Sequence, residues 1–87
     1  MSIIEETLKN SFYRIKILRM IYKNSTFKHY RTDHLYKVLD FSICEKTHRE
    51  LIIYKNIDNE QVWTRTTDEF FEKIKYENTT RFVKVKD

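Results

Sequence analysis

The 87 residues, with a mass of 10.8 kDa, suffice for one domain, which excludes an enzyme built around a cleft between two lobes. Hydrophobic residues make up 40% of the chain, aromatic residues 15% and charged residues 34%, a composition typical of a compact globular domain. Glycine and proline are both absent, which excludes the glycine-dependent phosphate loop, dinucleotide-binding fingerprint and nucleophile elbow.

The positive charge is concentrated in the first half of the chain. The formal net charge is +4, and residues 1–37 contain eight lysines and arginines against three acidic residues, whereas residues 38–87 contain nine against ten. A basic half attracts phosphate-bearing partners, although a net charge of this size is also ordinary for a soluble domain. Of these two interpretations, the ordinary charge of a soluble domain is somewhat favoured.

The cysteine content and the N-terminal residues indicate the compartment. Cys44 is the single cysteine, which excludes an intramolecular disulfide and is typical of a reducing environment. Acidic residues stand where a secretory signal carries bases, and no apolar run approaches the ~20 residues needed to cross a bilayer. We therefore expect a cytoplasmic protein without a membrane partner.

Apolar residues recur at helical spacing from Ser2 to about Lys23. Ser2 and Glu5 match a capping box, which is a helix start signal. One face of the helix, with Phe12 at its margin, consists of Ile4, Leu8, Ile15, Leu18 and Tyr22. The spacing predicts an N-terminal amphipathic helix within a helical extension over residues 1–26, ahead of a β-rich domain over residues 27–87.

A second apolar line, formed by Tyr13, Ile17 and Met20, lies opposite the first face. It is a candidate interaction surface, for a protein partner or for a second copy of the chain, although a single exposed apolar line is commonplace. A rival interpretation makes this segment a strand, in which Ile15 and its neighbours alternate with Arg14 and Lys16. The helix is preferred because its pattern lasts longer and has a start signal.

After Thr26 the sequence changes to short runs of β-branched and aromatic residues. These runs predict strands over residues 35–43, 51–57, 61–65 and 81–85, and a short strand that includes Ile74 and Tyr76. Residues 45–49 and 58–60 are the expected connections, with Asp58 and Asn59 as candidates for positive φ. A helical turn is expected over residues 68–71, with Thr66 and Glu69 as its cap. The pattern predicts a mainly β (α+β) fold: a small rolled sheet with the N-terminal helix packed outside it.

Six segments occur in the order typical of one family. They are Lys28-His29-Tyr30-Arg31, Leu35-Tyr36-Lys37-Val38-Leu39, Leu51-Ile52-Ile53-Tyr54, Trp63-Thr64-Arg65, Phe70-Phe71-Glu72 and Arg81-Phe82. Over about residues 27–83 this succession resembles the bacterial family called domain of unknown function sixteen fifty-three. The resemblance implies an SH3-like β-roll or barrel and supplies no activity, cofactor or ligand.

The sequence departs from the family pattern at four places, one of which is a hairpin before Trp63 that is one residue shorter. Thr32 stands where the family has glycine, Thr66 where it has proline, and Cys44-Glu45-Lys46-Thr47 where histidine-serine-glutamate-threonine is usual. Cys44 in place of the histidine puts any role of that turn in doubt.

Aromatic and cationic side chains of the resembling segments form the candidate ligand site. Aromatic rings offer flat faces to a base, and arginine offers a planar fork to phosphate or carboxylate. The candidate residues are His29, Tyr30, Arg31, Tyr36, Tyr54, Trp63 and Arg65. The alternative places Tyr54 and Trp63 in the core on neighbouring strands, and for Trp63 core packing is the favoured interpretation. For the site to exist, the sheet must close with guanidinium groups facing outward beside exposed rings.

Three further groups of residues could form a site, and each is a less favoured interpretation. A phosphate-binding track of helix residues (Lys9, Arg14, Lys16, Arg19 and Lys23) is less favoured than a solvated surface, because these residues do not form one stripe. A zinc site from Cys44, His48, His29 and His34 has ligand gaps of the right order, but neither pair matches a zinc-finger pattern. Catalysis by Cys44 with His48 as base lacks a third group and an oxyanion hole.

The sequence therefore predicts a non-enzymatic binding domain without metal or cofactor. Its expected ligand is anionic, a nucleotide or nucleic acid, bound by arginine, histidine and aromatic side chains. The alternative is a protein–protein interaction module that acts as a homo-oligomer, adaptor or inhibitor.

Overall fold

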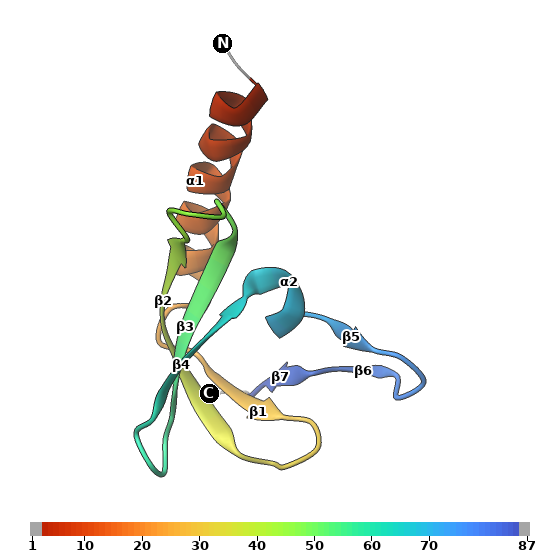
Figure 1. The fold of residues 1–87 in the computed structure, drawn as a ribbon. Helices are drawn as coiled ribbons and strands as arrows, with labels where there is room; N and C mark the ends of the chain where they lie inside the picture. The colour runs from red at the N-terminus through yellow and green to blue at the C-terminus, as the bar shows by residue number, and fades with distance from the viewer. Residues whose placement is uncertain (1–2, 86–87) are drawn as a thin grey trace.

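The structure is a computed structural model that describes residues 3–85. In chain order (Figure 1) the elements are α1 (Ile3–Tyr22), β1 (Thr26–His29), β2 (Leu35–Ile43), β3 (Glu50–Asn56), β4 (Val62–Thr66), α2 (Thr67–Phe70), β5 (Lys73–Ile74), β6 (Thr79–Thr80) and β7 (Phe82–Lys84). Five strands form one antiparallel sheet in the order β4-β3-β2-β1-β7, and β5 pairs with β6 in a separate hairpin. The mainly β class with an N-terminal helix is confirmed.

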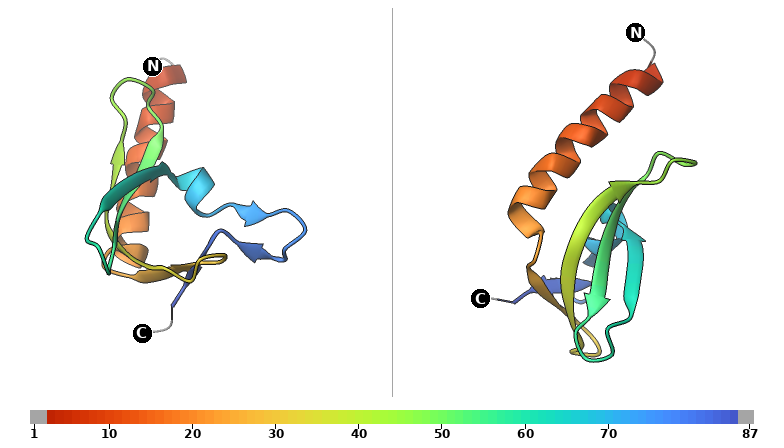
Figure 2. Two further views of the ribbon diagram at one scale, coloured as in Figure 1. Left: turned by 60° about the horizontal axis from the view of Figure 1, so that its bottom comes forward. Right: turned by 90° about the vertical axis from the view of Figure 1, so that its left-hand side faces the viewer.

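The N-terminal segment is helical, so the rival strand interpretation is wrong. Ile15 is buried in the core, and Leu18 and Tyr22 pack partly buried against it. Figure 2 shows that the C-terminal half of α1 runs beside the sheet while its first turns project away from it. Phe12 is 60% exposed, so it lies outside the buried face. The expected capping box depends on Ser2, which lies outside the described residues, as do the side chains of Ile4 and Leu8.

A polar anchor holds α1 on β2 at a bulge in that strand. The register of β2 against β3 shifts between Val38 and Asp40. Arg19 reaches this point, where its Nε lies 2.7 Å from Asp40 Oδ1 and its Nη2 donates to the Phe41 carbonyl at 2.8 Å. Asp40 Oδ1 also accepts from the Phe41 backbone N–H at 2.7 Å. The bulge bends the strand and leaves backbone groups free for the helix residue to satisfy.

Aromatic rings from several elements dominate the core. Phe70 of α2 stacks on Phe82 of β7, with ring centroids 4.2 Å apart and planes 5° apart, and it contacts Phe27 and Tyr54 at 5.2 Å. The helical turn that carries Phe70 begins as the sequence predicts, because Thr66 Oγ1 accepts from the Glu69 N–H at 3.3 Å. The N-cap therefore fixes the position of the most buried ring of the core.

The sheet curls but does not close, so the expected closed sheet is wrong. Its edge strands are β4 and β7, and no backbone ladder joins them within residues 3–85. They meet only through side chains, where the Arg65 guanidinium carbon lies 5.7 Å from the Phe82 ring centroid. Figures 1 and 2 show α2 at this opening, with the β5–β6 hairpin projecting outward beyond it. Closure would need continuous pairing of the edge strands, and α2 occupies the space where they would pair.

The strands that follow β1 largely agree with the predicted runs, whereas the turns differ. The strand over residues 35–43 is confirmed to the residue, and β3 and β4 each lie one residue away from the predicted range. The last strand, β7, is shorter than predicted, and the short strand β5 lies at Lys73–Ile74. The sequence did not predict β1 or β6. In the β3–β4 turn Glu60 has φ 62°, so the expectation of positive φ at Asp58 and Asn59 is wrong. The Asn56 N–H donates to the Gln61 carbonyl at 2.9 Å and closes a loop over residues 57–60. The left-handed residue of this loop comes last because Asn56 organises the first part. The Asn56 side-chain oxygen accepts from the N–H groups of Asp58 and Asn59 at 2.8 and 3.1 Å.

Candidate functional site

A cleft of about 220 Å³ brings together five of the seven predicted ligand residues. It lies where β1, β2, β3, β4 and β7 approach one another across the curled sheet. Its lining consists of His29, Thr32, Tyr36, Tyr54, Trp63, Arg65 and Phe82. The cleft exists because the edge strands stay unpaired, which leaves one end of the aromatic core open to solvent.

Tyrosine and tryptophan rings form the walls of the cleft. Tyr54 is buried, with 4% of its surface exposed, and it meets Tyr36 edge-on at a ring-centroid distance of 5.5 Å. Trp63 pairs with Tyr54 across the strands and is 51% exposed. The core interpretation is therefore correct for Tyr54 and wrong for Trp63. Since β4 is an edge strand and no element covers its first residues, the indole remains accessible.

His29 ends β1 and has a fixed tautomer. Its Nδ1 accepts from the backbone N–H groups of Arg31 at 3.2 Å and Thr32 at 3.4 Å. Because Nδ1 accepts, the neutral ring carries its proton on Nε2, which is free to donate to a ligand. The ring also stands edge-on to Phe82 at 5.2 Å, so its plane is set by packing.

The cations around His29 give the cleft a positive potential. Burial lowers the pKa of His29 below 6.5, and the charges of Arg81, Arg65 and Arg31 lower the pKa further. Arg81 is neutralised by Glu72, with Nη2 2.9 Å from the carboxylate oxygen. Arg65 and Arg31 have no carboxylate within 4.0 Å in the part of the chain that the structure describes. Two arginines without counterions therefore stand near a histidine whose pKa is lowered.

Two predicted residues lie beside the cleft and two lining residues were missed. The Arg31 guanidinium lies over the Tyr30 ring at 5.4 Å, and neither residue lines the cleft. Thr32 and Phe82 do line it. The sequence contained a signal for both, because Thr32 occupies a distinctive position of the family pattern and Phe82 belongs to its last segment.

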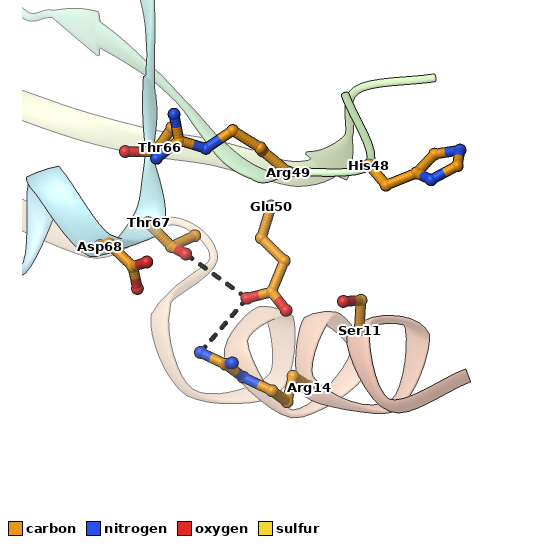
Figure 3. Close-up of a pocket in the computed structure, with 8 residues that line it drawn as sticks. All are labelled: Ser11, Arg14, His48, Arg49, Glu50, Thr66, Thr67 and Asp68. Atoms are coloured by element: carbon orange, nitrogen blue, oxygen red, sulfur yellow. Dashed lines mark hydrogen bonds and ion pairs between the residues drawn. The ribbon is translucent and has the colours of Figure 1, made fainter. Parts of the chain in front are cut away.

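A second hollow, of about 150 Å³, is polar and lies between α1, the β2–β3 turn and α2 (Figure 3). Its centre is Glu50, whose carboxylate lies 3.3 Å from Arg14 Nη2 and accepts from Thr67 Oγ1 at 3.4 Å. Figure 3 shows Arg14 and Thr67 directed at this carboxylate while His48 points away from it. The nearly buried charge of Glu50 is already paired, so we interpret this cluster as a structural contact that holds α1 against the sheet.

The alternative constellations are not assembled. Cys44 and His48 lie in the β2–β3 turn, whereas His29 and His34 lie at the opposite end of the sheet (Figure 1). Among the described residues no three histidine, cysteine or acidic side chains converge on one point. Hydrogen bonds from the Thr47 side chain, its backbone and that of Lys46 lower the pKa of the Cys44 thiol, and no hydrogen bond joins that thiol to His48 in the described part of the chain.

The helix cations are divided between ion pairs and solvent. Arg14 pairs with Glu50 and Arg19 with Asp40, so neither is free to follow a phosphate backbone. Lys16 and Lys23 are exposed. Within residues 3–85, no helix is long and apolar enough to span a membrane.

Comparison with known proteins adds one finding. A family model described as "Protein of unknown function (DUF1653)" matches residues 25–84, which include every strand and every residue that lines the cleft. Neither the curated proteins nor the solved structures gave a match.

Proposed function

The chain belongs to the DUF1653 family of proteins of unknown function, and we propose that it is a non-enzymatic, cytoplasmic binding domain for an anionic ligand that carries a planar ring. The ligand class is a nucleotide, free or within a nucleic acid. Its phosphate contacts Arg65 and His29, and its base lies against Trp63.

One observation supports this proposal above the others: an arginine without a carboxylate partner stands beside an accessible aromatic ring in a single cleft. Arg65 is fixed against Phe82 yet has no carboxylate partner among the described residues. An unpaired guanidinium beside a half-exposed indole favours a ligand with phosphate and base over a purely apolar one.

The size of the cleft limits the ligand. Pockets for drug-sized ligands span roughly 300–1,000 Å³, and the volume here is about 220 Å³. A cleft of this size accommodates one ring with one anionic group, so a mononucleotide or one nucleotide of a strand fits better than a dinucleotide cofactor.

Titration with adenosine monophosphate tests the proposal, because Trp63 is the only tryptophan and its fluorescence reports on the cleft. We expect the nucleotide to quench this fluorescence. Arg65→Ala should weaken the affinity about tenfold or more, since a hydrogen bond to a charged group is lost. Arg49→Ala removes the same charge from the β2–β3 turn, at the far end of the sheet, and should have no effect. Unchanged affinity in a folded Arg65→Ala variant would contradict the site.

A salt series separates the two forms of the ligand. If the ligand is a nucleic acid, single-stranded DNA binds more tightly than the mononucleotide, and its affinity falls steeply as salt rises because counterions are released. A flat salt response excludes nucleic acid and leaves the free nucleotide.

A second candidate function, protein–protein interaction, rests on a different surface. Tyr13, Ile17 and Met20 are exposed on α1 to 67%, 38% and 80%. Three exposed apolar side chains on one helix line favour a partner at this surface.

A further inference from the structure

We propose that the solvent-facing side of α1 binds an acidic amphipathic helix of a partner protein along a seam formed by Tyr13, Ile17 and Met20. This inference deepens the second candidate function, on which it rests, and it is independent of the cleft. Glu50 and Asp40 already hold α1 on the sheet through Arg14 and Arg19, so the seam takes no part in fixing the helix.

The spacing of the seam is that of a helix–helix contact. Tyr13, Ile17 and Met20 follow one another at intervals of four and three residues, and Asn10 continues the same line at its N-terminal end. Ile21, which is 53% exposed, borders this line, so the exposed apolar residues occupy the positions typical of a helix–helix contact. Asn10 at one end and the end of α1 at Tyr22 restrict the contact to about two turns.

The charge beside the seam determines the chemistry of the partner. Lys16 of α1 and Lys23, directly after its last residue, stand seven residues apart, a helical spacing that places both on one side of the seam. Lys16 and Lys23 are exposed and have no carboxylate within 4.0 Å among the described residues. The sequence contains no acidic residue between Glu6 and Asp33. This side of the helix therefore offers only cations and apolar groups.

The same lysines argue against a second copy of the chain as the occupant. Paired across two identical helices in antiparallel order, the lysines of one copy face those of the other. Like charges at such positions oppose association, and opposite charges select the partner. The occupant that complements the seam is a helix with apolar residues at the contact positions and glutamate or aspartate beside them.

Fluorescence anisotropy with two designed peptides tests this inference. Both are amphipathic helices of about 20 residues with leucine at the contact positions; one has glutamate beside them and the other lysine. We expect the full-length protein to bind the glutamate peptide and not the lysine peptide. The double variant Lys16→Glu/Lys23→Glu should weaken binding of the glutamate peptide about five- to tenfold and gain binding of the lysine peptide.

Matched control variants test whether peptide binding depends on the seam itself or only on the net charge and hydrophobicity of the protein. Lys46→Glu/Lys75→Glu makes the same change in net charge on exposed loops and should leave binding unchanged. Ile17→Asp should abolish binding, whereas Ile57→Asp, at a residue of similar exposure in the β3–β4 turn, should not. Arg65→Ala should also leave peptide binding intact, so failure of the cleft and failure of the seam are distinguishable.

Three results would overturn the inference. They are equal binding of the two peptides, tighter binding to vesicles of phosphatidylserine and phosphatidylcholine than to the glutamate peptide, and a dimer in sedimentation that Ile17→Asp converts to monomer. The second result would make a membrane the occupant, and the third would make it a second copy of the chain.

Discussion

At the scale of single residues, His29 reports on the charges around the cleft. Burial, Arg81, Arg65 and Arg31 all lower its pKa. We predict that Arg65→Ala raises the pKa of His29 toward 6.5, because one of these cations is removed. The measurement is the pH titration of the imidazole C–H resonances by NMR, with Arg49→Ala as the control. An unchanged pKa in Arg65→Ala would show that the two side chains do not interact.

The lowered pKa of His29 also makes the free energy of unfolding depend on pH. The folded state favours neutral His29, so this contribution is fully present above about pH 6.5 and is lost as the pH falls through the lowered pKa of the folded state. Acidification below neutrality should therefore reduce the free energy of unfolding. His29→Gln should flatten that part of the profile.

The absence of glycine forces other residues into the left-handed region. Among residues 3–85, the residues with positive φ are Asn24, Asp33, His48, Glu60, Tyr76 and Asn78. Asparagine and aspartate tolerate this conformation, whereas glutamate does so at a cost. We predict that Glu60→Gly raises the free energy of unfolding by about 0.5–1 kcal/mol in chemical denaturation. Asp58→Gly, in the same turn but without positive φ, should lower it; stabilisation by both changes would contradict this account.

At the scale of elements, α2 depends on its N-cap. Thr66 Oγ1 satisfies the Glu69 N–H, and α2 is only four residues long. We predict that Thr66→Ala lowers the free energy of unfolding by about 1 kcal/mol, whereas Thr66→Ser retains the hydroxyl and most of the stability. Since Phe70 rests on Phe82, which lines the cleft, Thr66→Ala should also change the NMR shifts of the Phe82 ring. Equal stability of the alanine and serine variants would contradict the role of the cap.

The elements differ in how far the sequence could predict them. α1, β2 and the cap of α2 were predictable because helical spacing, a run of β-branched residues and a Thr-x-x-Glu pair act locally. β1 was missed because its four residues carry no alternating pattern and pair with two distant strands. The position of Glu60 was missed because the Asn56 side chain, outside the loop, sets the shape of the turn.

For the candidate site too, local patterns predict some features and long-range contacts determine the others. Tyr54 and Trp63 could be assigned to one face of the sheet, since they pair across neighbouring strands. Which of the two is buried depends on where α2 packs, and that is a long-range contact. The open edge between β4 and β7 depends on the same placement, so neither the open sheet nor the cleft could be predicted from local patterns.

At the scale of the whole molecule, α1 is part of the core and not an appendage. Ile15 is buried together with residues of the sheet and α2, and Arg19 satisfies the bulge of β2. We predict that a chain of residues 25–87 is destabilised by several kcal/mol, since burial of one large aliphatic side chain is worth about 1.5–3 kcal/mol. Circular dichroism during thermal unfolding measures the loss. A truncated chain that melts at the temperature of the full chain would show that the β-rich part folds on its own.

The measurement that tests the central claim most directly is the pKa of His29 in the absence and in the presence of saturating adenosine monophosphate. Binding of a phosphate beside the imidazole stabilises its protonated form, so the pKa of His29 should rise, and by linkage the affinity should increase as the pH falls. The resonances of the Trp63 indole should shift in the same titration. If the pKa of His29 and the Trp63 resonances both stay unchanged at every nucleotide concentration, the cleft does not bind an anion with a ring.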